Sequence, residues 1–273
     1  SKIRVFNDFT QLDKIFKKKI DYVMNSISGI HGLEPTIKII KFTKKIAIAN
    51  KESIICGWNL IQSQLKKYKT EFIPVDSEHF SVWYGLKNYK SSDLENIFLT
   101  ASGGPFYKTS LNKFKKIKVS DALNHPNWKM GKKISTDSAT MINKVYEVIE
   151  AKKLFDINYQ KIKILIHPKS YVHAILKFNN GMTNVIVHDT TMKIPIFNTL
   201  FLNSDRKLKT KKVDLDILNN LNLNNVNSKR FPMIKLLDLL PDSHSLFETV
   251  IVAANDKLVE MFLNKKIQFT DIQ

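Results

Sequence analysis

A chain of 273 residues is long enough to bury a sizeable core, as one large domain or two small ones. Its apolar fraction of 43% and charged fraction of 25% are typical of a soluble globular protein, and no run approaches the ~18 apolar residues of a membrane span. The net charge of +18 comes from lysines spread along the chain with few arginines, which favours anionic small substrates over nucleic acid. We therefore expect neither a nucleic-acid nor a membrane partner. The single cysteine, Cys56, lies in an apolar run. It is therefore expected to be a small buried hydrophobic residue of a protein in a reducing compartment.

The first 75 residues alternate between short apolar runs and helical patterns. Such alternation predicts a parallel α/β sheet, in which functional residues gather at the carboxyl ends of the strands. Two polar triplets, Asn50-Lys51-Glu52 and Asp76-Ser77-Glu78, fall at such ends. The predicted strands are 21–25, 45–49 and 71–75, with helices within 27–40 and over 50–65.

Asp76 and Glu78 are separated by one residue directly after an apolar strand. In an extended segment, side chains two apart point to the same side, so both carboxylates could converge on one hard cation. The alternative is that Asp76 only caps a helix that begins near Ser77. The two-carboxylate pattern is too common to decide between them.

The next predicted strand, 96–101, ends in Ser102-Gly103-Gly104, followed later by a loop over 125–132. Adjacent glycines and a serine hydroxyl could form an anion-binding loop, or simply a tight turn. The later loop displays Trp128 and Met130 between proline and glycine residues. These side chains either anchor the loop to the core or belong to a lid that closes on a ligand.

A helix is predicted to begin at Asp137 or Ser138 and to continue to about residue 150. A helix N-terminus with free amides and hydroxyls is a ready phosphate site. Asn143 and Glu147 are four residues apart and share one face, with Lys144 at its edge, which suggests binding. The alternative is a solvent-exposed pair of Lys144 and Glu147 with little energetic weight.

From residue 162 the pattern predicts strands at 162–166, 171–178 and 182–188, the last two joined at Asn179-Asn180-Gly181 as a hairpin. His167 and His173 fit structural roles better than ligand roles. A short helix is expected after Pro195, up to residue 202. Two helices, 231–240 and 245–263, are expected near the end.

Five of these segments, in order and spacing, resemble the motifs of the 1-deoxy-D-xylulose 5-phosphate reductoisomerase family. The resemblance runs from about Val23 to the end of the chain. It implies an NADPH-dependent enzyme of the non-mevalonate isoprenoid route that converts 1-deoxy-D-xylulose 5-phosphate to 2-C-methyl-D-erythritol 4-phosphate. The segments are 49–53 (Ala-Asn-Lys-Glu-Ser), 75–79 (Val-Asp-Ser-Glu-His), 101–106 (Ala-Ser-Gly-Gly-Pro-Phe), 125–134 (His-Pro-Asn-Trp-Lys-Met-Gly-Lys-Lys-Ile) and 137–144 (Asp-Ser-Ala-Thr-Met-Ile-Asn-Lys).

By this resemblance, residues receive roles through the motifs that they match. The metal would be Mg²⁺ or Mn²⁺, with Co²⁺ as an alternative, and its ligands Asp76, Glu78 and Glu147 would be catalytic together with Lys51. The family's cofactor-binding positions match Asn50, Glu52 and Gly131, and its flap positions match Trp128, Met130 and Met192. The substrate-binding positions match Lys51, Ser77, Glu78, Ser102, His125, Ser138, Asn143, Lys144 and Glu147.

The chain departs from the family at several points. Val145 and Tyr146 stand where the family usually has glycine and an aliphatic residue, and 187–192 differs from the usual acidic-Pro-Asp-Met pattern. The Gly-rich loop of a complete dinucleotide-binding domain is absent from this sequence, and only the start of a C-terminal helical domain is present. We therefore expect the chain to be the middle of a longer cytoplasmic or plastid enzyme.

The expected fold is α/β: a partial Rossmann-like NADP-binding domain and an α+β catalytic domain with a mixed or antiparallel sheet. A homodimer is expected through the β-rich segment. The alternatives are a catalytically silent metal- and sugar-phosphate-binding fragment and a metal-dependent sugar-phosphate lyase. The expected parts are 1–76, the remainder of the NADPH-binding domain; 77–203, the catalytic, metal-binding and dimerisation domain; 204–230, a linker; and 231–273, the start of the C-terminal helical region.

Overall fold

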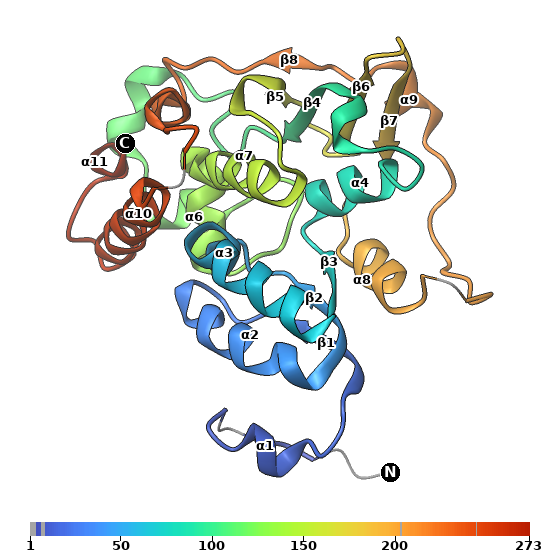
Figure 1. Ribbon diagram of the computed structural model, residues 1–273. Helices are drawn as coiled ribbons and strands as arrows, with labels where there is room; N and C mark the ends of the chain where they lie inside the picture. The colour runs from blue at the N-terminus through green and yellow to red at the C-terminus, as the bar shows by residue number, and fades with distance from the viewer. Residues whose placement is uncertain (1–3, 7–8, 203, 244) are drawn as a thin grey trace. The chain divides into compact units, whose positions relative to one another are not determined.

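The computed structural model describes residues 4–6, 9–202, 204–243 and 245–273 (Figure 1). The chain divides into two compact units, Ser1–Asp76 and Ser77–Gln273. Within the described part of the chain, every helix is too short or too polar to cross a membrane.

The first unit contains a three-stranded parallel sheet in the order β1-β2-β3. The central strand β2 is the most buried, and Ile46, Ala47 and Ile48 are fully enclosed. The alternation of strand and helix predicted for this part is therefore confirmed. Its helices and strands are α1 (Leu12–Ile15), β1 (Ile20–Asn25), α2 (Leu33–Ile39), β2 (Thr43–Ile48), α3 (Lys51–Tyr68) and β3 (Glu71–Pro74).

Asn50 fixes the start of α3 directly after β2. Its Oδ1 accepts a hydrogen bond from the backbone N–H of Ser53 at 2.6 Å, as an N-cap residue does. Its Nδ2 donates to the carbonyl of Gly29 at 2.6 Å, which ties the helix to the turn before α2. The polar triplet that begins with Asn50 is thereby held at the carboxyl end of β2.

The second unit is built on a five-stranded mixed sheet in the order β7-β6-β4-β5-β8. Strands β4 and β5 are parallel, and every other neighbouring pair is antiparallel. The expected α/β fold with a mixed second sheet is therefore confirmed. The elements of this unit are α4 (Ser77–Gly85), β4 (Leu94–Ala101), α5 (Val119–Leu123), α6 (Lys132–Thr140), α7 (Ile142–Phe155), β5 (Ile162–Ile166), β6 (Val172–Phe178), β7 (Thr183–Val187), α8 (Lys193–Leu200), α9 (Leu215–Asn219), β8 (Asn224–Asn225), α10 (Phe247–Leu263) and α11 (Phe269–Ile272).

Helices α4 and α7 carry polar motif residues and pack against this sheet. Helix α4 packs on β6 and β7, and α7 packs on β4 and β5 (Figure 1).

Farther along the chain, an aromatic cluster joins three segments: the rings of Phe106, Phe114 and Phe269 meet at centroid distances of 5.1 to 6.1 Å. This aromatic cluster fastens the loop after β4 and the 3-10 helix Leu111–Lys116 to the C-terminal helix α11.

Two predictions of local backbone structure are wrong. Glu78 lies in the first turn of α4, so the extended segment assumed for Asp76 and Glu78 ends before Glu78. Asp137 and Ser138 lie inside α6 and cap nothing; the helix breaks later, at Met141, whose φ of 67° is left-handed. The segment 231–240, expected as a helix, contains the 3-10 helix Pro232–Leu239.

Candidate active site

A buried lysine joins two carboxylates from different helices in the second unit. The Nζ of Lys144, on α7, lies 2.7 Å from Oε1 of Glu78, on α4, and also contacts Oε2 of Glu147. Lys144 is only 4% exposed and Glu147 only 1%. Burial opposes the charged form of Lys144, but the carboxylates of Glu147 and Glu78 outweigh it and raise the pKa of the ammonium above 10.5. The solvent-exposed pair considered as an alternative is therefore wrong.

Neighbouring polar groups donate hydrogen bonds to both carboxylates. Asn143 donates from Nδ2 to Oε1 of Glu147 at 2.5 Å, and the Ser77 hydroxyl donates to Oε2 of Glu78 at 2.6 Å. The shared face expected for Asn143 and Glu147 is thus confirmed. The arrangement is a pocket of oxygen ligands built to hold a positive charge, occupied by the Lys144 ammonium.

His79 and Glu150 support this cluster from behind, and the sequence analysis missed both. His79 donates from Nε2 to the backbone carbonyl of Glu147 at 2.8 Å, and its Nδ1 lies 3.2 Å from Oε2 of Glu150. Both side chains are at most 1% exposed. Because His79 follows Glu78 directly, this contact fixes the carboxylate of α4 relative to that of α7. Their spacing in the sequence, 68 residues or more, gave no signal.

A second polar group surrounds His125, at the start of the loop that joins α5 and α6. Its Nδ1 accepts the backbone N–H groups of Asn127 at 3.2 Å and Trp128 at 3.0 Å. Since Nδ1 is an acceptor, Nε2 carries the proton of the neutral ring and donates to the Ser102 hydroxyl at 3.1 Å. Burial lowers the pKa of His125 to about 4, so the neutral form predominates at pH 7.

The loop after β4 is both a tight turn and part of this group. Gly103 and Gly104 have φ values of 83° and 63°, and the Gly104 amide donates to the Ser102 hydroxyl at 3.0 Å. That amide therefore serves the turn and does not face an anion. A Cβ on Gly104 would lie 2.9 Å from the carbonyl of Ser138, so glycine lets the loop pack closely on α6.

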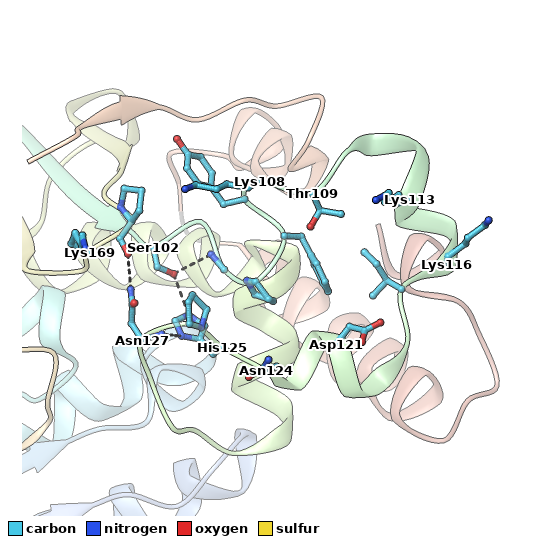
Figure 2. Close-up of a pocket in the computed structure, with 17 residues that line it drawn as sticks. Ser102, Lys108, Thr109, Lys113, Lys116, Asp121, Asn124, His125, Asn127 and Lys169 are labelled. Atoms are coloured by element: carbon cyan, nitrogen blue, oxygen red, sulfur yellow. Dashed lines mark hydrogen bonds between the residues drawn. The ribbon is translucent and has the colours of Figure 1, made fainter.

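These residues line one wall of a cavity of about 1020 Å³ in the second unit (Figure 2). Ser102, His125 and Asn127 lie at one end of the view, and Lys113 and Lys116 lie at the other. Further lysines, Lys108 and Lys169, also border the cavity, against a single carboxylate, Asp121. The cavity therefore suits an anionic ligand.

The other residues assigned by motif occupy several places in the second unit. Trp128, Met130 and Gly131 belong to the loop 124–131, which lines a smaller cavity of about 560 Å³. Met192 directly precedes α8, on a different segment. Asp137, which precedes Ser138, is buried in α6 and pairs with Lys133 at 2.8 Å and with Asn255 at 2.8 Å.

Four assigned residues belong to the first unit. Asn50 caps α3, as described above, and Lys51 and Glu52 lie in its first turn, where both are at most 9% exposed. The Nζ of Lys51 lies 2.8 Å from Oδ2 of Asp76, at the end of the unit. Lys51 and Asp76 are thus brought together as an ion pair.

Comparison with known proteins identifies the family. Three family models match, described as 1-deoxy-D-xylulose 5-phosphate reductoisomerase over residues 1–57 and as its C-terminal domains over 72–155 and 188–273. The protein of that name from Pelagibacter ubique is 63% identical, and the match covers the whole chain and 71% of the relative. The one from Aquifex aeolicus is 39% identical over 95% of the chain and 67% of the relative.

Solved structures agree with this result. The reductoisomerase of Zymomonas mobilis in complex with NADPH has a TM-score of 0.83 and 34% identity over 92% of this chain. A DOX-P reductoisomerase in complex with NADPH, fosmidomycin and magnesium has a TM-score of 0.81 and 33% identity over 93% of this chain. The chain spans 65% and 64% of these two proteins, respectively. The chain therefore belongs to the 1-deoxy-D-xylulose 5-phosphate reductoisomerase family.

Proposed function

We propose that this chain is the catalytic portion of an enzyme that converts 1-deoxy-D-xylulose 5-phosphate to 2-C-methyl-D-erythritol 4-phosphate. In that reaction one carbon–carbon bond breaks, another forms, and the resulting aldehyde takes a hydride from NADPH and a proton. The observation that carries the proposal is the buried cluster of Glu78, Lys144 and Glu147 in a chain of this family. It combines carboxylate ligands for a cation with an ammonium group for an anion, and the same unit contains the lysine-bordered cavity of Figure 2.

The residues of the cluster fit a divalent metal. Glu78 and Glu147 already converge on one positive charge, and oxygen ligands of this kind are those that Mg²⁺ and Mn²⁺ prefer. Asp76 stands two residues before Glu78 in the chain and would be the third ligand. Such a metal would polarise the oxygens of the ketose during the rearrangement. Lys144 would then turn from the carboxylates to the substrate phosphate.

The groups around His125 would grip the phosphate end of the substrate. The imidazole donates to the Ser102 oxygen, which leaves the Ser102 hydroxyl hydrogen to donate to an anionic oxygen. Asn143 and Ser77 would orient the substrate while they hold the two carboxylates. The remaining substrate contacts are proposed from their match to the family motifs. They are Ser138, Lys51, Glu78 and Glu147.

The first unit would bind the nicotinamide cofactor. Asn50 and Glu52 lie at the carboxyl end of a parallel strand, the edge at which dinucleotides bind in sheets of this class. Gly131 matches a cofactor-binding position of the family, and NADPH would supply the hydride. Trp128, Met130 and Met192 would cover the bound substrate as a flap.

The test is NADPH oxidation with 1-deoxy-D-xylulose 5-phosphate and Mn²⁺, measured on this chain and on the longer protein proposed to contain it. Turnover by the longer protein should vanish with Glu147→Gln, whereas Glu260→Gln, a change of a half-exposed carboxylate, should leave it intact. Metal-dependent substrate binding without NADPH oxidation would instead support a silent binding fragment. Carbon–carbon cleavage without reduction would support a lyase.

We also propose a homodimer in the cytoplasm or in a plastid. Strand β7 is an edge strand of the five-stranded sheet, and Val185 in it and Met182 before it are 45% and 58% exposed. An edge that displays apolar side chains is suited to pairing with a second copy. Sedimentation at micromolar concentration should give twice the monomer mass for the parent and the monomer mass for Val185→Lys. Cell fractionation addresses the location.

A further inference from the structure

Two histidines stack face to face beside the proposed flap. His173 lies on β6 and His188 directly follows β7; their ring centroids are 3.6 Å apart and the planes differ by 14°. The register explains the contact, because Val172 pairs with Val187 and Ala174 with Ile186, so that His173 is the extra residue of a β-bulge. Bulges re-aim side chains, and this one turns His173 onto the ring that follows β7.

His188 holds His173 in two ways. The Nε2–H of His173 donates to the backbone carbonyl of His188 at 3.2 Å, and the ring of His188 covers one face of the His173 ring. The Nδ1–H of His188 is used elsewhere, on the carbonyl of Asp189 at 2.8 Å. The backbone contact would survive any substitution at 188, so the side chain contributes its flat face.

The held ring of His173 in turn supports Trp128. Their centroids are 6.5 Å apart at an interplanar angle of 72°, an edge-to-face contact. The loop before Trp128 is already anchored, because Asn127 donates from Nδ2 to the Pro168 carbonyl at 2.7 Å and to the Ser170 hydroxyl at 2.8 Å. The indole itself has no such anchor among these contacts and depends on the surface that it meets.

We propose that His188 is a positioning residue that fixes the orientation of the Trp128 indole through His173. The proposal rests on the proposed function only in that Trp128 covers the substrate there. What position 188 must supply is a planar ring at stacking distance from His173. This assigns a role to the residue that directly follows β7.

The first experiment observes Trp128 directly and needs no substrate. The background Trp58→Phe/Trp83→Phe leaves Trp128 as the single tryptophan. His188→Ala should raise the acrylamide quenching constant of Trp128 about twofold and lower its anisotropy, because the supporting ring becomes free to turn. His188→Phe restores a flat face and should return both values to those of the parent.

A control separates positioning from general loosening of the sheet. Val187→Ala removes packing from the neighbouring residue of β7 but keeps the stacked rings, and it should leave Trp128 quenching unchanged. Equal quenching in His188→Ala and the parent overturns the proposal. So does a His188→Phe variant that behaves like His188→Ala, because a planar ring would then not be what matters.

The second experiment measures kinetics in the longer enzyme. His188→Ala should raise KM for the sugar phosphate about fivefold with kcat within about twofold, as loss of binding contacts does, and His188→Phe should restore KM. An unchanged KM overturns the link from Trp128 to the substrate. If the parent enzyme shows no turnover at all, the proposed function fails, while the fluorescence result still decides whether His188 positions Trp128.

Discussion

Replacement of Lys144 by methionine should expose how strongly the buried cluster depends on the Lys144 ammonium. Methionine is apolar and has nearly the length of the lysine stem, so the change removes the ammonium with little loss of volume. It leaves the carboxylates of Glu78 and Glu147, which are 15% and 2% exposed as side chains, close together with no cation between them. Two negative charges then face each other, without the Lys144 ammonium, in a site that is largely shielded from water.

Removing one partner of a buried ion pair typically costs about 3 to 5 kcal/mol. Because Glu78 keeps some contact with water, we expect the lower end, about 3 kcal/mol at pH 7. The loss should shrink in acid, since protonation of one carboxylate relieves the repulsion between the two. The double variant Lys144→Met/Glu147→Gln should be more stable than the single variant, because it removes one of the two negative charges that repel each other.

Urea unfolding in a Trp58→Phe background measures this effect, because the remaining tryptophans, Trp83 and Trp128, both report on the second unit. Lys257→Met is the matched control: Lys257 and its partner Glu260 are 66% and 55% exposed, so it should change the free energy of unfolding by less than about 0.5 kcal/mol. Millimolar Mn²⁺ should recover stability in Lys144→Met and not in the double variant. A decrease of less than about 1 kcal/mol in the free energy of unfolding of Lys144→Met would refute the reasoning, because loss of the counter-charge of a buried ion pair should destabilise the fold by more than that.

Two further predictions concern pH and salt. Burial, and then the neighbouring His188, lower the pKa of His173 from 6.5 to about 3, so the unfolded chain binds the proton more readily and stability falls as the pH drops through this range. The contribution of His173 to the free energy of unfolding should fall by about 2 kcal/mol between pH 8 and pH 5. The free energy of unfolding of His173→Asn, measured in urea, should lack this part of the pH dependence. Separately, Lys113→Gln/Lys116→Gln should raise KM for the sugar phosphate at low ionic strength, with the difference lost near 0.5 M salt. The control variant Lys90→Gln/Lys163→Gln changes two exposed lysines away from the cavity of Figure 2 and should leave KM unchanged. An equal rise of KM in both double variants would show an effect of net charge alone.

The parts of the fold that the sequence analysis predicted correctly depend on neighbours along the chain. Asn50 caps α3 because a side-chain oxygen reaches an amide three residues later. The Asn179-Asn180-Gly181 turn joins β6 and β7 because Gly181 adopts a φ of 89° at little cost. Both interactions lie within a few residues, so the residue types themselves contain the information.

The buried cluster was predictable only in part. The spacing of Asn143 and Glu147 indicated a shared face, and Glu78 was singled out as a candidate ligand on the assumption of an extended backbone, whereas it lies in α4. That Lys144 bridges Glu78 and Glu147 could not be inferred, because residue 78 lies on another helix 66 positions away. Which charges meet is decided by the packing of α4 and α7 on one sheet, and hydrophobic periodicity does not specify that packing.

The break between α6 and α7 shows why local rules fail close to the proposed site. Asp137 and Ser138 have the residue types of an N-cap, yet Asp137 is used by Lys133 and by Asn255, which lies 118 residues later. The chain turns instead at Met141, a left-handed residue that is not glycine and is 2% exposed. Such a conformation costs on the order of 1 kcal/mol and persists only where packing imposes it. Here the packing of α6 against the Gly104 loop on one side and the start of α7 on the other fixes the break, and α7 is the helix that carries Lys144 and Glu147. The backbone is therefore least predictable where it must place the charged groups, because long-range contacts outweigh the preference of each residue there.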